Sequence, residues 1–163
     1  MKRGTQLALL MMAMSLLGSA QTKEYSKGDG YAFFSPGVTS PGTVTWGHLG
    51  GGGEGYFSRY LGVGAEVGYL APMQSFSSGI GTLSPNVVAR FRAKDERNKV
   101  EPFATGGYTL FFRSGHANGF NFGGGVNYWL KDHVGLRLEV RDNVWTLGET
   151  VHYVGFRVGV TFR

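Results

Sequence analysis

The sequence contains no cysteine, only five prolines, and no hydrophobic run long enough for a membrane-spanning helix. The absence of cysteine excludes a disulfide scaffold, a lipoprotein anchor and any thiolate metal site. A transmembrane helix needs about 20 consecutive apolar residues. If the chain crosses a membrane, it therefore has to do so with β-strands. Its length fits one domain, held together by burial and hydrogen bonds alone.

Charged residues are also scarce, at 17% of the 163 residues, and they are dispersed along the chain. The formal net charge is +5, which falls to +3 when Lys2 and Arg3 are removed with the leader described below. A nucleic-acid-binding surface needs basic residues gathered in a patch or stripe. We therefore expect no nucleic-acid partner.

The N-terminus has the pattern of a secretory signal peptide. A basic start is followed by an apolar run over residues 7–17 and by small residues that end at Ala20. The run is too short for a transmembrane anchor, and small residues close it where signal peptidase cleaves. The sequence therefore predicts a signal peptide over residues 1–20, cleaved after Ala20, and a single exported domain over residues 21–163.

Glycine and aromatic residues dominate what remains. The chain has 28 Gly, 12 Phe, 8 Tyr and 3 Trp, a composition that favours an all-β protein with closely approaching backbones. Apolar residues alternate with glycine, polar or charged residues, which is the period of a β-strand. Turn residues divide this pattern into eight expected strands: Gly30 to Ser35, Trp46 to Phe57, Tyr60 to Leu70, Gly81 to Ala93, Lys99 to Phe112, Gly119 to Leu130, Val134 to Asn143 and Val151 to Arg163.

The expected connections alternate in length. Tight turns follow the second, fourth and sixth segments at residues 58–59, 94–98 and 131–133, whereas longer loops follow the others. An even strand number with tight turns at one end and longer loops at the other is typical of bacterial outer-membrane barrels. The sequence therefore predicts an eight-stranded antiparallel up-and-down transmembrane β-barrel, closed by pairing of the last strand with the first.

Each expected strand has one apolar face and one small or charged face. In the segment 134–143, apolar side chains alternate with Arg137, Glu139 and Arg141. We expect the apolar faces to meet lipid and the charges to pair inside a lumen just wide enough for side chains. The expected lumen charges are Glu54, Glu66, Arg90, Arg92, Glu101, Arg137, Glu139, Arg141 and Arg157. Aromatic residues expected in girdles at the two membrane interfaces are Tyr31, Phe57, Tyr60, Tyr69, Phe112, Tyr128 and Phe162.

Residues with catalytic or metal-binding potential are few. The four histidines are far apart in the sequence. Ser114 and His116 share a loop, but no acid is evidently placed to orient the histidine. We therefore expect no catalytic, cofactor-binding or metal site and no cofactor.

Five segments resemble strands of a known family: Gly51 to Gly55, Leu61 to Tyr69, Val100 to Tyr108, Phe122 to Leu130 and Gly135 to Asp142. They are similar to the small outer-membrane β-barrels of Gram-negative bacteria, the OmpA-like and OmpX-like group. The resemblance implies an outer-membrane location and a C-terminal signal read by the barrel-assembly machinery. Residues that match this signal are Phe156, Val158, Val160 and Phe162, although Arg163 follows where the family typically ends on an aromatic residue.

The sequence favours a non-enzymatic, monomeric barrel that serves envelope integrity or binds a surface ligand through its loops, with outer-membrane lipids around it. Three alternatives are a narrow pore, a soluble lipocalin-like exported binder, and a lipid-modifying hydrolase at the rim that uses Ser114 and His116. The lipocalin-like alternative requires the opposite orientation of the strand faces, with apolar side chains inside.

Overall fold

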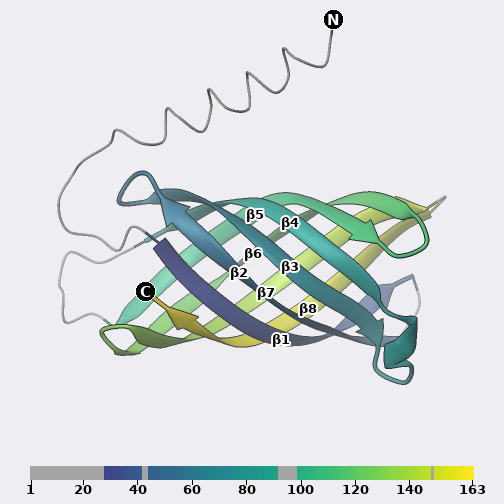
Figure 1. Cartoon of the computed structure of the whole chain (residues 1–163), viewed down its shortest axis with the longest axis horizontal. Helices are drawn as coiled ribbons and strands as arrows, with labels where there is room; N and C mark the ends of the chain where they lie inside the picture. The colour runs from purple at the N-terminus through teal and green to yellow at the C-terminus, as the bar shows by residue number, and fades with distance from the viewer. Residues whose placement is uncertain (1–27, 42–43, 92–98, 148) are drawn as a thin grey trace, which may run out of the picture.

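The structure is a computed structural model that describes residues 28–41, 44–91, 99–147 and 149–163. Eight antiparallel strands form a closed barrel in sequence order, and β1 pairs with β8 (Figure 1). The strands are β1 (Gly28–Ser40), β2 (Thr45–Tyr56), β3 (Leu61–Pro72), β4 (Ile80–Arg90), β5 (Val100–Phe112), β6 (His116–Lys131), β7 (Val134–Leu147) and β8 (Glu149–Phe162). This confirms the predicted fold class. The predicted signal peptide lies outside the described residues.

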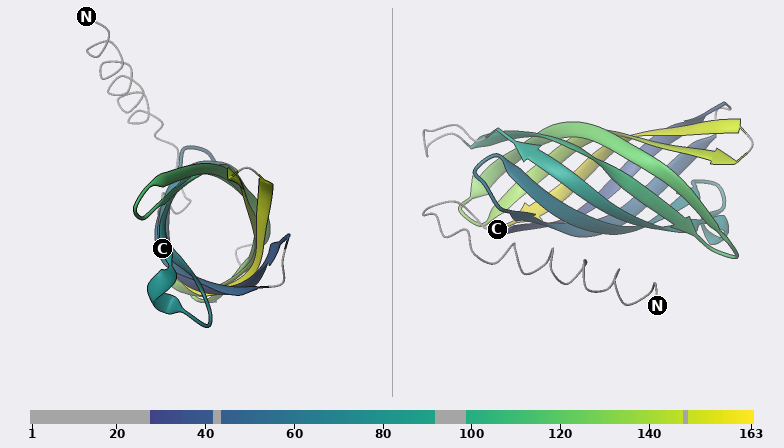
Figure 2. Two further views of the ribbon diagram at one scale, coloured as in Figure 1. Left: turned by 90° about the vertical axis from the view of Figure 1, so that its right-hand side faces the viewer. Right: turned by 90° about the horizontal axis from the view of Figure 1, so that it is seen from above.

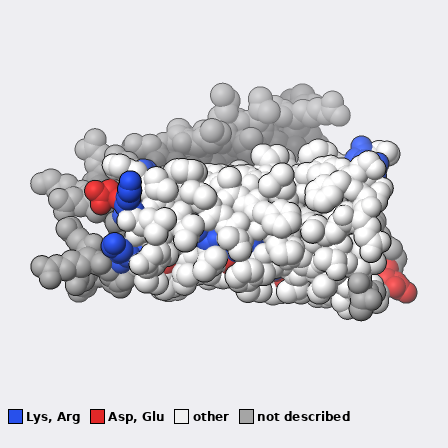
Figure 3. Space-filling view, turned by 90° about the horizontal axis from the view of Figure 1, so that it is seen from below, with Lys and Arg blue, Asp and Glu red and all other residues white. Residues whose placement is uncertain are grey.

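The strand faces have the orientation expected of a barrel in lipid. On β3, Val67 is 58% exposed whereas its neighbour Glu66 is 1% exposed. Charged atoms on the face shown in Figure 3 gather mainly at the two ends of the barrel. This arrangement is the reverse of a lipocalin-like binder and excludes that alternative. In the part of the chain that the structure describes, no helix is long and apolar enough to span a membrane.

The first strand is longer than predicted. The sequence placed its end at Ser35 because Pro36 follows, but β1 continues to Ser40. Pro36 has no N–H to donate, and the β1–β8 pairing is interrupted at Ser35 and Pro36. It then resumes in the same register at Gly37. The proline therefore removes a local part of the ladder without ending the strand.

The predicted long loops at one end are mostly additional strand. The last loop, expected over residues 144–150, is a hairpin in which β7 ends at Leu147 and β8 begins at Glu149. Trp145 pairs with Val151 across it. Only three residues separate β5 from β6. The loop at residues 73–79 between β3 and β4 is longer and contains the 3-10 turn η2 (Phe76–Ser78).

The interior is layered along the barrel axis. A buried apolar cluster of Leu70, Phe111, Trp145 and Tyr153 lies toward the end formed by the β1–β2, β3–β4, β5–β6 and β7–β8 connections. A second cluster of Tyr56, Val88 and Phe103 lies toward the other end, where both described ends of the chain are found (Figure 1). Buried charged and polar side chains lie between these two clusters, and the buried charges Asp29, Arg90 and Glu101 lie beside the second cluster toward the described chain ends.

Candidate functional site: the charged lumen and the rim

Strand alternation carries the charged residues into the barrel. Eight of the nine charges expected in the lumen are buried, each at most 5% exposed: Glu54, Glu66, Arg90, Glu101, Arg137, Glu139, Arg141 and Arg157. Arg92 lies outside the described residues. Removing an ion from water costs several kcal/mol, so buried charges of this kind need close partners.

Glu66 of β3 is held by two arginines from the opposite side of the lumen. Arg157 of β8 makes a two-point contact, with Nη1 at 2.7 Å from Oε2 and Nη2 at 3.0 Å from Oε1 of Glu66. Arg141 of β7 places its Nη1 at 3.3 Å from the same Oε2. Contacts at both oxygens are the strongest geometry available to a carboxylate–guanidinium pair.

Glu139 extends this cluster into a continuous chain of ion pairs. Its carboxylate accepts from Nε of Arg141 and from Nε of Arg137, the latter at 3.3 Å. Arg137 also reaches across to Glu54 of β2, with 2.8 Å between Nη2 and Oε1. The chain therefore runs from Glu54 on β2 through three residues of β7 to Glu66, and it joins walls that are not neighbours in the sheet.

Tyr31 is a lumen residue, so its predicted place in an interface girdle is wrong. It is 6% exposed, and its hydroxyl donates to Oε2 of Glu66 over 3.1 Å. The inward face of β1 consists of alternate residues from Asp29 to Thr39, whereas the sequence predicted only a short strand here and assigned no faces to it. The other six residues predicted for the girdles are exposed: Phe57, Tyr60, Tyr69, Phe112, Tyr128 and Phe162.

Aromatic rings stack on the lumen guanidinium groups. The guanidinium carbon of Arg137 lies 3.9 Å from the ring centre of Phe103 and 4.2 Å from that of Tyr31. Arg157 lies 4.0 Å from the ring centre of Phe33. Stacking on a ring adds an attractive contact while the edges of the guanidinium remain available for hydrogen bonds. None of these aromatic partners was predicted for the lumen.

His48 of β2 also lies in the lumen, where it contacts Arg157 and Thr82. Its Nδ1 lies 3.3 Å from Nη2 of Arg157, and its Nε2 lies 3.1 Å from Oγ1 of Thr82. Because a guanidinium donates only, Nδ1 is the acceptor and Nε2 carries the proton that His48 donates to Thr82. Gly68 leaves room for this contact, since a Cβ there would lie 2.3 Å from Nε2 of His48.

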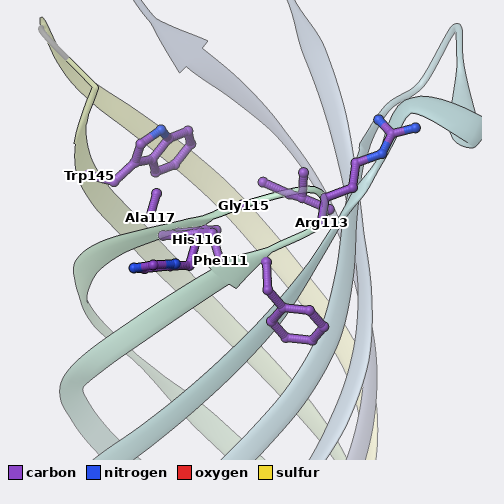
Figure 4. Close-up of a pocket in the computed structure, with 8 residues that line it drawn as sticks. Phe111, Arg113, Gly115, His116, Ala117 and Trp145 are labelled. Atoms are coloured by element: carbon purple, nitrogen blue, oxygen red, sulfur yellow. The ribbon is translucent and has the colours of Figure 1, made fainter.

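An apolar pocket of about 250 Å³ opens at the rim beside the β5–β6 hairpin (Figure 4). Its wall includes Ile80, Phe111, Ala117 and Trp145, and the rings of Phe111 and Trp145 lie 4.8 Å apart. Binding sites for drug-sized molecules are typically about 300–1,000 Å³ and contain a few convergent polar groups. This pocket is smaller and mainly apolar, with Arg113 and His116 as the polar side chains of its lining, so it offers few groups that could orient a small molecule.

No acidic side chain that the structure describes pairs with Ser114 or His116, the residues of the rim-hydrolase alternative. Both residues are exposed on the β5–β6 hairpin. His152 of β8 does contact an acidic side chain, with Nδ1 at 2.8 Å from Oδ2 of Asp142. Among the described residues, no three His, Asp or Glu side chains converge as a metal site.

Comparison with known protein families identifies the family of this barrel. Residues 6–163 match the family described as the outer membrane protein beta-barrel domain. The chain belongs to this family. Because this is a family of outer-membrane barrels, the barrel lies in the outer membrane of a Gram-negative bacterium, with lipid around its apolar wall. A search of curated protein sequences gave no match.

Solved structures of other outer-membrane barrels share the fold. Neisserial surface protein A has a TM-score of 0.67 and 15% identity, covering 86% of this chain and 99% of that chain. The N-terminal barrel domain of Pseudomonas aeruginosa OprF has a TM-score of 0.62 and 12% identity, covering 85% and 100%. The outer membrane enzyme PagL has a TM-score of 0.56 and 16% identity, covering 83% and 99%. At these identities the similarity concerns the fold alone.

The residues of the predicted assembly signal lie on the outward face of β8. Phe156, Val158, Val160 and Phe162 are all exposed on it, from 38% for Val160 to 50% for Phe156. β8 pairs with β7 on one side and β1 on the other. The role of these four residues in assembly stays a prediction.

Proposed function

We propose that this chain is a non-enzymatic, monomeric outer-membrane barrel with a sealed lumen that contributes to envelope integrity. The observation that carries the proposal is the ion-pair chain from Glu54 to Arg157, which crosses the lumen between two apolar layers. An eight-stranded barrel has an interior that side chains fill, whereas aqueous channels occur in much larger barrels. Side chains that bridge opposite walls support a structural role over that of a pore.

Surface contacts are the second part of this role. At the rim opposite the described chain ends, the β5–β6 and β7–β8 connections are tight hairpins of paired strands, and β6, the longest strand at 16 residues, starts there. Hairpins that continue the wall present rigid edges to the cell exterior, which favours contact with large partners over enclosure of a small ligand. The predicted surface ligand therefore binds to hairpin edges in this proposal.

Export and assembly complete the proposal. The signal peptide over residues 1–20 directs export, and the outward face of β8 is read by the barrel-assembly machinery. Replacement of Phe162 by serine removes the aromatic side chain nearest the end of that face. We expect this variant to reach the outer membrane in lower yield than the parent, as measured in membrane fractions.

Two measurements on producing cells test the proposal. Membrane fractions run on a gel without boiling should show a compact, faster-migrating form that shifts after heating. Mass spectrometry of the outer-membrane lipids should give the same acyl composition with and without the protein. Loss of an acyl chain in producing cells would contradict the non-enzymatic role, and variants Ser114→Ala, His116→Ala and His152→Ala would then locate the activity.

A further inference from the structure

The loop at residues 73–79 lies against the outside of the barrel wall. In Figure 2 the teal loop with η2 stands outside the ring of strands. Two outward wall positions next to it, Gly47 and Ala71, are buried, and Ala71 is 0% exposed. Their outward neighbours Leu49 and Tyr69 are exposed. Gly47 and Ala71 are cross-strand partners on β2 and β3, so the loop covers one continuous piece of wall.

The side chains over this piece of wall are apolar. A Cβ placed on Gly47 would lie 2.8 Å from Sδ of Met73, 3.5 Å from Cε2 of Phe34 and 3.6 Å from Cζ of Phe76. These three side chains therefore meet above Gly47, where the missing side chain allows close approach. They keep substantial outer surface, with exposed fractions of 40% for Phe34, 41% for Met73 and 48% for Phe76. We call them the outer-rim patch.

Polar contacts hold the loop in this position from two sides. The hydroxyl of Tyr69 donates to the carbonyl of Phe76 over 2.6 Å and accepts from the N–H of Gly79 over 3.1 Å. Arg113 of the neighbouring hairpin donates to the last two carbonyls of η2 at 3.0 and 2.8 Å. A patch held in one place loses little conformational entropy when it meets its partner.

We propose that the outer-rim patch is a membrane anchor that inserts into the boundary between headgroups and acyl chains of the outer leaflet. The patch continues the lipid-facing wall, where Leu49 is 57% exposed on the strand that it covers. Aromatic and apolar side chains on a polar segment favour this depth of the bilayer. Serines at positions 75, 77 and 78 give the same loop a polar side. The proposal rests on the membrane setting of the barrel.

A spin-label experiment tests the anchor, and the chain is suited to it because it has no cysteine. Variants Phe76→Cys and Met73→Cys each receive one nitroxide in the mature chain folded into phospholipid vesicles. Leu49→Cys is the control on the lipid-facing wall, and Ser77→Cys is the control on the same loop. Heat-shift migration establishes that each labelled variant is folded.

The readout is the ratio of nitroxide accessibility to oxygen, which concentrates in lipid, and to a nickel chelate, which stays in water. We expect labels at 73 and 76 to give ratios close to that at 49 and several-fold above that at 77. A ratio at 76 equal to that at 77 would overturn the anchor and point to a protein partner for the patch. Aqueous ratios at 76 and 49 together would overturn the membrane setting, and the anchor with it.

Discussion

At the scale of single residues, the buried arginines combine two kinds of partner. Arg137 contacts the rings of both Tyr31 and Phe103, while its Nη2 reaches Glu54. Arg157 uses Phe33 in the same way, with Glu66 at its edge. A planar guanidinium can satisfy both contacts at once, which a lysine ammonium cannot. This pairing allows long charged side chains to fill a narrow lumen.

Neutralising Glu66 should be strongly destabilising. Glu66→Gln leaves Arg141 and Arg157 without the carboxylate that both contact, and loss of one partner of a buried pair costs about 3–5 kcal/mol. Unfolding by urea in vesicles, followed by tryptophan fluorescence, measures the change. Glu149→Gln at the exposed β7–β8 hairpin is the matched control and should stay within about 0.5 kcal/mol of the parent. Equal stability of the two variants would contradict the assigned role of Glu66.

Replacing Gly68 by a larger residue should destabilise the barrel, because His48 and Thr82 are in contact beside it. In Gly68→Ala the added Cβ would lie 2.3 Å from Nε2 of His48 and 2.8 Å from Oγ1 of Thr82. Overpacking of this kind costs about 1–3 kcal/mol. The same unfolding measurement on Gly115→Ala is the control, since no atom lies within 4 Å of a Cβ there. A neutral effect at 68 would show that the His48 contact is not formed.

Strand alternation in the sequence was enough to place Glu54, Arg137 and their charged neighbours on the inward faces. It was not enough to pair them, because the partner of each charge depends on the stagger of strands around the barrel. The aromatic partners were missed for a related reason. Tyr31 and Phe33 lie on the inward face of β1. The strand predicted there was so short that its alternation of inward and outward side chains was not recognised.

At the scale of elements, the residues at which the strands begin and end were harder to predict than the central part of each strand. Pro36 was taken as the end of a strand, and residues 144–150 were taken as a loop. In both places cross-strand pairing on neighbouring strands extends the wall beyond the local signal. Turn-forming residues thus indicate only the local preference of the backbone. The hydrogen-bonded ladder of a closed barrel continues past them wherever both neighbouring strands supply hydrogen-bond partners.

The lipid-facing side of β7 should tolerate charge according to depth. Leu138 lies on the outward face near the middle of the strand, and Thr146 lies on the same face near the rim. Leu138→Arg should cost about 2–4 kcal/mol in vesicles, and Thr146→Arg about 0–1 kcal/mol. Urea unfolding of both variants gives the comparison. Tolerance of arginine at 138 equal to that at 146 would mean that this face is not in lipid.

At the scale of the whole molecule, the barrel is closed in two senses. The pairing of β1 with β8 leaves no free edge among the described strands, which is the condition for a sheet to remain in a bilayer. Inside the barrel, the ion-pair chain crosses between opposite walls and buried apolar clusters lie toward both ends. This closure of the wall and the contacts across the lumen are the basis of the structural role proposed above.

Planar-bilayer recording of the mature chain is the most direct test of the sealed lumen. The folded protein is added to a lipid bilayer in salt solution, and its insertion is verified by heat-shift migration of the same sample. The ion-pair chain and the two apolar layers predict no steady conductance steps above the bare membrane. Reproducible ohmic steps from the folded protein would contradict the sealed lumen and favour the narrow pore.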